Sequence, residues 1–265
     1  MGLLDLLKLP QAKDTSSLDD RSLTLLHKEI LLQKGFLKKV YKKFYRDLMS
    51  HIPEPQTKTL VELGSGAGFI KQMYPNVQTS DVLDLTGLVD KVFDATKMPF
   101  DDKTIDGILL INVLHHIKNV EQFFTEACRV LKEHGRIVMI EPANTPWSRF
   151  VYTRFHHEVF DPNADWQVEG ERPLLDGNDA LAWIIFHRDR EVFTKKFPEF
   201  TIIKTYCHTP ISYLLSGGFT LKQLLPACSY GIISGIEFLS RFAGNLTGMF
   251  QTIVLEKRSH GLKKD

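Results

Sequence analysis

The sequence predicts an α/β fold built on a doubly wound, mostly parallel sheet of seven strands. From residue 59 onward, short apolar segments of strand type alternate with segments of helical periodicity, which is typical of a parallel sheet with helices on both faces. The run Ile105–Ile111 is almost continuously apolar, as expected for a strand that is covered on both faces. A glycine-rich turn follows the first predicted strand, and right-handed crossovers place such a turn at the carboxyl edge of the sheet, where α/β folds bind ligands.

Residues 1–57 are expected to form an N-terminal helical extension. A helical pattern runs from Leu23 to Met49, and large apolar residues recur every four positions between Phe36 and Leu48. Basic residues occupy the opposite side between Lys38 and Arg46. Two interpretations stay open for this helix: a solvated basic face above a buried apolar face, or a basic amphipathic helix that rests on an anionic membrane.

The core of the fold is expected over residues 58–143. An amphipathic helix is predicted at Val120–Glu133, and a brief helix is predicted between the glycine turn and Tyr74. The strands of this core are predicted at residues 59–63, 76–81, 91–93, 105–111 and 136–140.

Residues 144–199 break the alternation, and they are expected to form an insertion that caps the substrate, because an insertion of this length in a compact domain is usually functional. Residues 200–265 are expected to complete the sheet with strands at 200–205 and 250–256. Between these strands lies an apolar stretch, Ile211–Phe250, with few charges. It is interpreted either as core or a homodimer contact, or as a groove for a lipid-like molecule or a surface for a bilayer.

Composition excludes several classes of protein. Hydrophobic residues make up 43% and charged residues 25%, as in an ordinary globular protein, and the net charge of +1 gives no general attraction to DNA. The three cysteines are far apart and predict neither a metal site nor a disulfide framework. The N-terminus lacks the features of a secretory signal, so the expected location is cytoplasmic, with peripheral contact at the inner membrane surface as an alternative.

The glycine turn spans Glu62-Leu-Gly-Ser-Gly-Ala-Gly68. Glycines allow positive φ angles and let the backbone approach a ligand closely, and a helix that starts after them offers free N–H groups to an anion. The dinucleotide fingerprint G-x-G-x-x-G is not met, because Phe69 stands at its sixth position. A P-loop is excluded because no Gly-Lys-Ser/Thr follows.

Several further segments carry a resemblance to a known family. Val61–Gly68 resembles motif I of class I S-adenosylmethionine-dependent methyltransferases, and Phe93–Phe100 is similar to their adenine-contact motif. Thr104–His116 resembles their fourth-strand motif, while Glu126–Lys132 and Gly135–Pro142 resemble the helix and fifth strand of the small-molecule (type 11) branch. The resemblance implies a Rossmann-like methyltransferase fold with S-adenosylmethionine as methyl donor and S-adenosylhomocysteine as product.

The resemblance also implies a set of cofactor contacts. The glycines would wrap the methionine portion, and Glu62 would receive the ammonium group, since a carboxylate accepts strongly from cationic donors. Asp81 would accept the ribose hydroxyls, although its interval from the turn is short and Asp84 competes for this role. Asp94 would accept the adenine amino group, and Asn112 would line the methionine side. The full implied set is Glu62, Gly64, Ser65, Gly66, Gly68, Asp81, Asp94, Ala95 and Asn112.

Methyl transfer is an in-line displacement at a sulfonium carbon, so it mainly needs alignment and a dry pocket. A base is required only when the acceptor carries a proton, and His116 and His157 are the candidate catalytic residues, with Glu158 nearby. For the His115-His116 pair, a role in starting the next helix is an equal alternative. Candidate substrate-binding residues are Glu141, Trp166 and Arg188, the last with a structural ion-pair network as its alternative. No metal is expected, because no acidic cluster resembles the magnesium site of catechol-type enzymes.

The resulting hypothesis is an enzyme that methylates a small or lipid-linked acceptor, at oxygen in preference to nitrogen or carbon. One alternative is an RNA or protein methyltransferase, for which the basic helix is the sole support. A second alternative is a non-catalytic module that binds S-adenosylmethionine without turnover, and the intact glycine turn and Asp94 argue against it.

Overall fold

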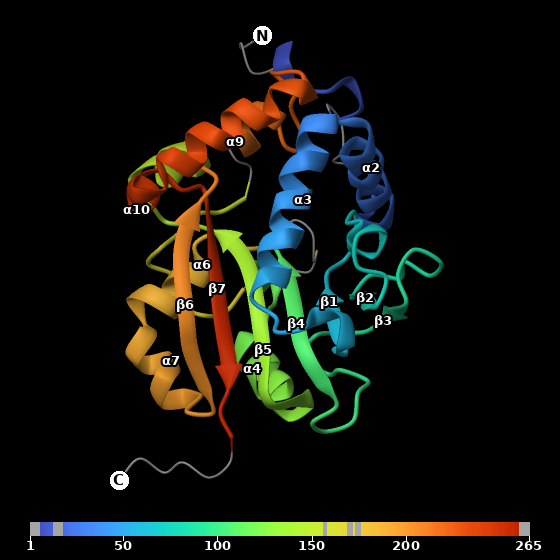
Figure 1. The fold of residues 1–265 in the computed structure, drawn as a ribbon, viewed down its shortest axis with the longest axis vertical. Helices are drawn as coiled ribbons and strands as arrows, with labels where there is room; N and C mark the ends of the chain where they lie inside the picture. The colour runs from blue at the N-terminus through green and yellow to red at the C-terminus, as the bar shows by residue number, and fades with distance from the viewer. Residues whose placement is uncertain (1–5, 13–17, 156–157, 169–171, 173–175, 260–265) are drawn as a thin grey trace.

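The computed structural model describes residues 6–12, 18–155, 158–168, 172 and 176–259. Its centre is a seven-stranded sheet with the strand order β3-β2-β1-β4-β5-β7-β6 (Figure 1). β7 runs antiparallel to both of its neighbours, and the other neighbouring strands are parallel. The strands are β1 (Leu60–Leu63), β2 (Val77–Asp81), β3 (Lys91–Val92), β4 (Ile105–Ile111), β5 (Leu131–Pro142), β6 (Phe200–His208) and β7 (Phe250–Lys257). The predicted doubly wound, mostly parallel sheet is confirmed.

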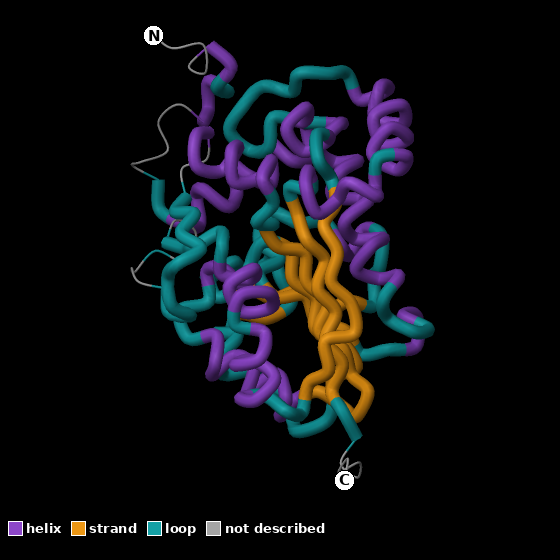
Figure 2. The backbone as a smooth tube through the Cα atoms, turned by 90° about the vertical axis from the view of Figure 1, so that its left-hand side faces the viewer, coloured by secondary structure: helices purple, strands orange, loops and turns teal. Residues whose placement is uncertain are grey.

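Helices cover both faces of this sheet, which Figure 2 shows from the side. The principal helices are α2 (Asp20–Gln33), α3 (Gly35–Ser50), α4 (Val120–Val130), α5 (Pro146–Phe155), α6 (Leu181–Trp183), α7 (Arg190–Lys196), α8 (Ser212–Ser216), α9 (Tyr230–Leu239) and α10 (Gly244–Thr247). α3 packs on one face, whereas α4, α6 and α7 pack on the other. α9 and α10 lie above the ends of β6 and β7 (Figure 1).

Alternating side chains of β4 explain why this strand reads as continuously apolar. Ile108 and Leu110 point into the cluster formed with α4, α6 and α7, while Leu109 points into the cluster formed with α3. All three side chains are fully buried. A strand with two buried faces needs apolar residues at successive positions, so the sequence pattern and the packing have the same cause.

The N-terminal helical segment is two helices and not the single one expected. Lys34 interrupts it with an extended backbone (φ −84°, ψ 93°) between α2 and α3. The Lys34 ammonium is buried and donates to the carbonyl oxygens of Gly218 (2.6 Å) and Leu221 (2.7 Å). Burial lowers the pKa of Lys34 to about 8. The break turns α2 away from α3, so that α2 lies over the carboxyl edge of the sheet.

The helix expected directly after the glycine turn is not found: these residues are described, and they form a 3-10 turn, η3 (Ile70–Gln72), in place of an α-helix. The backbone N–H of Phe69 donates to the Tyr45 hydroxyl, and that of Gly68 donates to the Ser65 carbonyl. The expectation that a helix N-terminus offers free N–H groups to an anion is therefore wrong, because the protein itself uses them.

The insertion over residues 144–199 divides into two parts. Its first part contributes five residues to the cavity at the carboxyl edge of the sheet: Tyr152, Arg154, Phe155, Glu158 and Asp179. Its second part packs against the sheet, because Ile185, Phe186 and Phe193 belong to the buried core with α4. Among the described residues, no helix is both long enough and apolar enough to span a bilayer.

Candidate functional site

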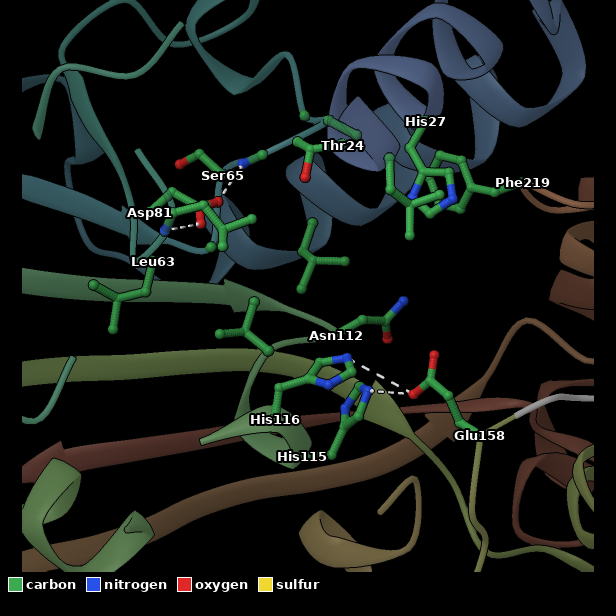
Figure 3. Close-up of a pocket in the computed structure, with 18 of the residues that line it drawn as sticks. Thr24, His27, Leu63, Ser65, Asp81, Asn112, His115, His116, Glu158 and Phe219 are labelled. Atoms are coloured by element: carbon green, nitrogen blue, oxygen red, sulfur yellow. Dashed lines mark hydrogen bonds and ion pairs between the residues drawn. The ribbon is translucent and has the colours of Figure 1, made fainter. Parts of the chain in front are cut away.

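A single cavity of about 1280 Å³ opens at the carboxyl ends of β1, β2 and β4. The glycine turn forms its floor at one end, α2 covers it, and the segment around Phe219 closes one side (Figure 3). Every residue of the predicted cofactor set lines this cavity: Glu62, Gly64, Ser65, Gly66, Gly68, Asp81, Asp94, Ala95 and Asn112. Segments distant in the sequence thus meet where a doubly wound sheet is expected to bind a ligand.

Close packing requires glycine at two positions of the turn. Gly64 has a φ of +61°, and a Cβ there would lie 2.5 Å from Cγ2 of Val113. At Gly68 a Cβ would overlap the Tyr45 hydroxyl and lie 2.8 Å from the Ser65 carbonyl oxygen. The turn is held against neighbouring elements on both sides, so its shape is fixed before any ligand binds.

Glu62 presents a buried carboxylate to the cavity. Its side chain is almost inaccessible to solvent, and its Oε2 atom has no hydrogen-bond partner among the described residues. Burial raises the pKa of Glu62 to about 8, with a further contribution from Asp81. An unsatisfied buried acceptor costs free energy, and a cationic donor such as an ammonium group would remove that cost.

Two more aspartates stand at the strand ends as expected. Oδ2 of Asp81 accepts from the Gly66 N–H at 3.0 Å and Oδ1 accepts from the Leu83 N–H at 3.0 Å, while burial raises the pKa of Asp81. Asp94 accepts from both the N–H and the hydroxyl of Thr96 at 2.7 Å. Asp84, the competitor of Asp81, is bonded to Thr86 outside the cavity wall.

Asn112 lies between the two ends of the cavity (Figure 3). Its backbone is left-handed, with a φ of +55°, and its N–H donates to the Ile140 carbonyl at 2.9 Å. Its Oδ1 is buried and, within the described part of the chain, has no hydrogen-bond partner. The orphaned oxygens of Glu62 and Asn112, together with the glycine cradle, fit the amino-acid portion of S-adenosylmethionine.

The opposite end of the cavity carries His115, His116 and Glu158. Nε2 of His115 lies 3.4 Å from Oε2 of Glu158, and Nε2 of His116 lies 3.7 Å from the same oxygen. Figure 3 shows both rings turned toward this one carboxylate. Asp179 adds a second carboxylate, 3.6 Å from Nε2 of His115.

The two histidines occupy different electrostatic environments. Burial disfavours the charged form of His115, but Glu141, Glu158 and Asp179 together raise its pKa well above the ordinary value. Burial and the neighbouring His115 instead lower the pKa of His116.

Glu141, a predicted substrate-binding residue, is fully buried beneath the cavity wall. Its Oε1 accepts from the N–H groups of Val113 (2.9 Å) and Leu114 (2.8 Å), and its Oε2 lies 2.6 Å from Nδ1 of His115. Glu141 is therefore placed to position His115 and not to touch a substrate.

The other predicted substrate residues lie away from the cavity. Trp166 is buried against Phe193, and its indole N–H donates to Asp189 at 2.9 Å. Arg188 also binds Asp189, and it donates to the carbonyl oxygens of Pro162 and Ala164. This arrangement is the structural network that the sequence analysis kept as an alternative for Arg188. His157 lies outside the described residues.

Sequence reasoning missed the residues that cover the cavity. Thr24 and His27 come from α2, and the His27 ring packs against Phe219 with a centroid distance of 4.7 Å. Tyr152 and Tyr213 line the end of the cavity that carries Glu158 and Asp179. These residues belong to no motif, and only the break at Lys34 brings α2 over the site, so periodicity carried no signal for them.

Comparisons with known proteins agree with this geometry. The family described as "Methyltransferase domain" matches residues 67–139. Demethylmenaquinone methyltransferase of Streptomyces avermitilis is 34% identical over 73 residues, which cover 27% of this chain and 32% of that protein. The corresponding protein of Symbiobacterium thermophilum is 34% identical over 77 residues, which cover 28% of this chain and 30% of that protein. The chain thus matches about a third of the length of these curated relatives.

Solved structures resemble the chain over more of its length. Geranyl diphosphate C-methyltransferase from Streptomyces coelicolor has a TM-score of 0.46 with 16% identity, covering 84% of this chain and 82% of that one. A SAM-dependent methyltransferase from Archaeoglobus fulgidus has a TM-score of 0.48 with 15% identity, covering 82% of this chain and 94% of that one.

The glycine cradle can be tested with Gly66→Val. A Cβ at this position would lie 3.2 Å from Cγ2 of Thr24 and 3.3 Å from Oδ2 of Asp81, so valine branches would fill the cradle. We expect the affinity for S-adenosylmethionine, measured by isothermal titration calorimetry, to fall by at least about tenfold. Gly235→Val is the matched control, because a Cβ there meets open space. Equal affinities for the two variants would contradict the assignment of the cradle.

Proposed function

We propose that this chain is a class I S-adenosylmethionine-dependent methyltransferase that transfers a methyl group to a hydroxyl of a small apolar acceptor. The observation that carries the proposal is the continuity of the cavity. One continuous cavity, partly open to solvent, is lined both by the residues suited to S-adenosylmethionine and by His115, His116 and Glu158. We call the part around the glycine turn the first compartment and the part around the two histidines the second compartment. Its volume of about 1280 Å³ exceeds that of a typical single-ligand pocket, roughly 300–1,000 Å³.

The residues of the first compartment would hold the methyl donor. Glu62 and Asn112 would bind its amino-acid portion, Asp81 the ribose and Asp94 the adenine. S-adenosylmethionine supplies a methyl group made electrophilic by its sulfonium. The chain's own contribution is to fix the donor on a preformed turn and to exclude water under α2.

The second compartment would hold the acceptor. Its walls are largely apolar, formed by Leu26, Ile30, Tyr213, Phe219 and Phe250. Its polar end presents Nε2 of His116 and a carboxylate oxygen of Glu158, which would accept a hydrogen bond from a hydroxyl and take up its proton. They lie beside His115, whose raised pKa favours the charged ring. The printed name of the curated relatives, demethylmenaquinone methyltransferase, also points to a small quinone-type acceptor.

The RNA or protein alternative gains no support from the basic helix. On α3, Lys39 donates to the Ala227 carbonyl, Lys43 pairs with the buried Glu237, and Lys38 lies over the Phe69 ring. These cations hold the fold together and do not form a free basic surface. The apolar side of α3 is buried, so this helix also offers no apolar face to a membrane.

A different surface suits an anionic bilayer. Ile232, Ile236, Leu239, Phe242 and Leu246 follow one another at intervals of three or four residues, and Phe242 is 88% exposed.

We call these five exposed residues, Ile232, Ile236, Leu239, Phe242 and Leu246, the apolar stripe. The charged residues around it also suit an anionic bilayer. Arg241 stacks on Phe238 at 4.5 Å, and Arg154 stacks on the exposed Phe150 of the adjacent α5 at 4.4 Å. Glu237, the one acidic residue within residues 146–155 and 230–247, is buried. A basic, apolar surface of this kind binds anionic lipid, and it would bring the chain to a lipid-like acceptor.

Cofactor binding should release a proton from Glu62. With a pKa of about 8, the free Glu62 is mostly protonated at neutral pH, and an ammonium ligand favours the carboxylate. Because the free protein holds a proton that the complex loses, affinity should rise with pH up to about pH 8, by at most about tenfold per unit.

Calorimetry at about pH 6.5 in two buffers of different ionisation enthalpy measures this release directly. Glu62→Gln should release no proton and bind more weakly, and Asp84→Asn should behave as wild type. A wild-type enthalpy that is identical in the two buffers would refute the proposed contact.

Oxygen methylation predicts a simple difference between two acceptors. An alkyl-tailed phenol should gain one methyl from isotopically labelled S-adenosylmethionine, whereas its ready-made methyl ether should gain none. Extraction of the label into an organic phase, followed by mass spectrometry, measures both. Equal labelling of the two compounds would show transfer to carbon and overturn the hydroxyl assignment.

Membrane contact should depend on the apolar stripe. The double variant Leu239→Ser, Phe242→Ser should weaken co-sedimentation with phosphatidylglycerol vesicles by at least about tenfold, because each buried large side chain contributes roughly 1.5–3 kcal/mol. Val192→Ser on α7 is the control, since this exposed apolar residue belongs to another surface. The stripe is a subunit contact if the wild type does not bind vesicles and elutes as a dimer in size-exclusion chromatography, whereas the double variant elutes as a monomer.

A further inference from the structure

We infer that His115, His116 and Glu158 form a binding site for a divalent transition-metal ion of the Zn²⁺ type. Nε2 of each histidine and a carboxylate oxygen of Glu158 lie within 4.8 Å of one another at the acceptor end of the cavity. The site goes beyond the proposed function, because an ion can be bound and detected there without donor or acceptor.

The hydrogen bonds of the two rings decide which nitrogens face the site. Nδ1 of His115 lies 2.6 Å from the carboxylate of Glu141, and Nδ1 of His116 lies 3.2 Å from the Asp176 carbonyl oxygen. Both partners are acceptors, so each Nδ1 must carry the hydrogen. In the neutral rings, Nε2 therefore presents a lone pair toward Glu158. A histidine oriented through its other nitrogen by a carboxylate or a carbonyl is the usual arrangement of a metal ligand.

Three acceptor atoms that face one another repel unless a cation lies between them. In the free protein the raised pKa of His115 supplies this cation as a proton. The separations of 3.4 and 3.7 Å are longer than most N–H···O hydrogen bonds, about 2.7–3.2 Å, so this proton is held loosely and a metal ion can displace it. Ligand atoms around a tetrahedral ion with bonds of about 2.0–2.1 Å are separated by roughly 3.3 Å. The separations of both ring nitrogens from the Glu158 oxygen, 3.4 and 3.7 Å, are close to this value.

The ligand types select the class of ion. Two imidazoles and one carboxylate suit Zn²⁺, Co²⁺ or Fe²⁺, whereas Mg²⁺ and Ca²⁺ prefer sites composed of oxygen atoms. Three protein ligands also leave a coordination position for a further molecule, as in catalytic zinc sites. Here that position faces the cavity, where an acceptor oxygen would bind. Asp179, 3.6 Å from Nε2 of His115, adds negative charge that favours a cation.

Packing around the pair restricts other arrangements. A Cβ at Gly177 would lie 2.8 Å from Nδ1 of His116 and 3.1 Å from the His115 carbonyl oxygen. The backbone at Gly177 therefore lies directly against the back of the His116 ring. The rings of His115 and His116 lie 4.1 Å apart between centroids. Both side chains are held in place by the protein, so the site is preformed.

Titration of metal-stripped wild type with Co²⁺ provides the test, because protein-bound Co²⁺ gives visible absorption bands. We expect one equivalent to bind, with Zn²⁺ displacing it. His116→Ala and Glu158→Gln should each weaken Co²⁺ binding by at least about tenfold. Loss of an outer-shell partner alone weakens metal affinity by roughly 10–100-fold, and loss of a direct ligand should cost no less. His134→Ala is the control, since His134 is an exposed histidine far from the cavity.

Binding of S-adenosylmethionine by each variant shows that it is folded, and it separates this proposal from the proposed function. Failure to bind Co²⁺ while S-adenosylmethionine still binds would refute the metal site alone. Co²⁺ binding that survives in both His116→Ala and Glu158→Gln would equally refute it, because the ion would then sit elsewhere. If nitrogen NMR shows that His115 stays protonated on both nitrogens in the presence of Zn²⁺, the cation between these side chains is a proton and the metal site is refuted.

Discussion

The buried carboxylate of Glu141 is the interaction on which both ends of the site depend. It joins β5 to the loop after β4 by accepting from the N–H groups of Val113 and Leu114 and by holding Nδ1 of His115. Val113 packs directly against Gly64, so the same carboxylate supports the glycine turn. A buried charge with several donors is stable only in this geometry, which explains how one residue sets the shape of the donor end and the orientation of the acceptor end.

The parts of the fold that sequence predicted are those with a strong local cause. Ile105–Ile111 was predicted to the residue because its apolar run, interrupted at Asp106 and Gly107, ends sharply at Asn112. The glycine turn was found because positive φ at Gly64 is a backbone requirement visible in the sequence. The cofactor residues follow from their order around that turn, and all of them line the cavity.

The parts that sequence missed depend on long-range contacts. Gly35 is the local sign of a helix break at Lys34, but the extended backbone of Lys34 is stabilised by a carbonyl group 184 residues further along the chain, which periodicity cannot reveal. Trp166 looked like a pocket residue by composition, yet its indole N–H donates to Asp189, 23 residues further along the chain, which periodicity cannot reveal. Glu158 meets His115 and His116 only after the insertion folds back over the sheet, so no spacing in the sequence indicates the cluster they form.

The two ends of the cavity share one electrostatic property. Glu62 and Asn112 present buried oxygens that lack donors among the described residues, and at the other end the Nε2 atoms of His115 and His116 lie 3.4 and 3.7 Å from one oxygen of Glu158. An unsatisfied buried polar group costs about 1–3 kcal/mol, so such atoms weaken the free protein. A cation at each end would satisfy them: the ammonium of an amino-acid-bearing donor at Glu62, and an ion or a proton at the histidines. The fold thus keeps acceptor atoms without donors at Glu62 and Asn112, where the proposed methyl donor would lie, and a cluster of charged groups where the proposed methyl acceptor would lie.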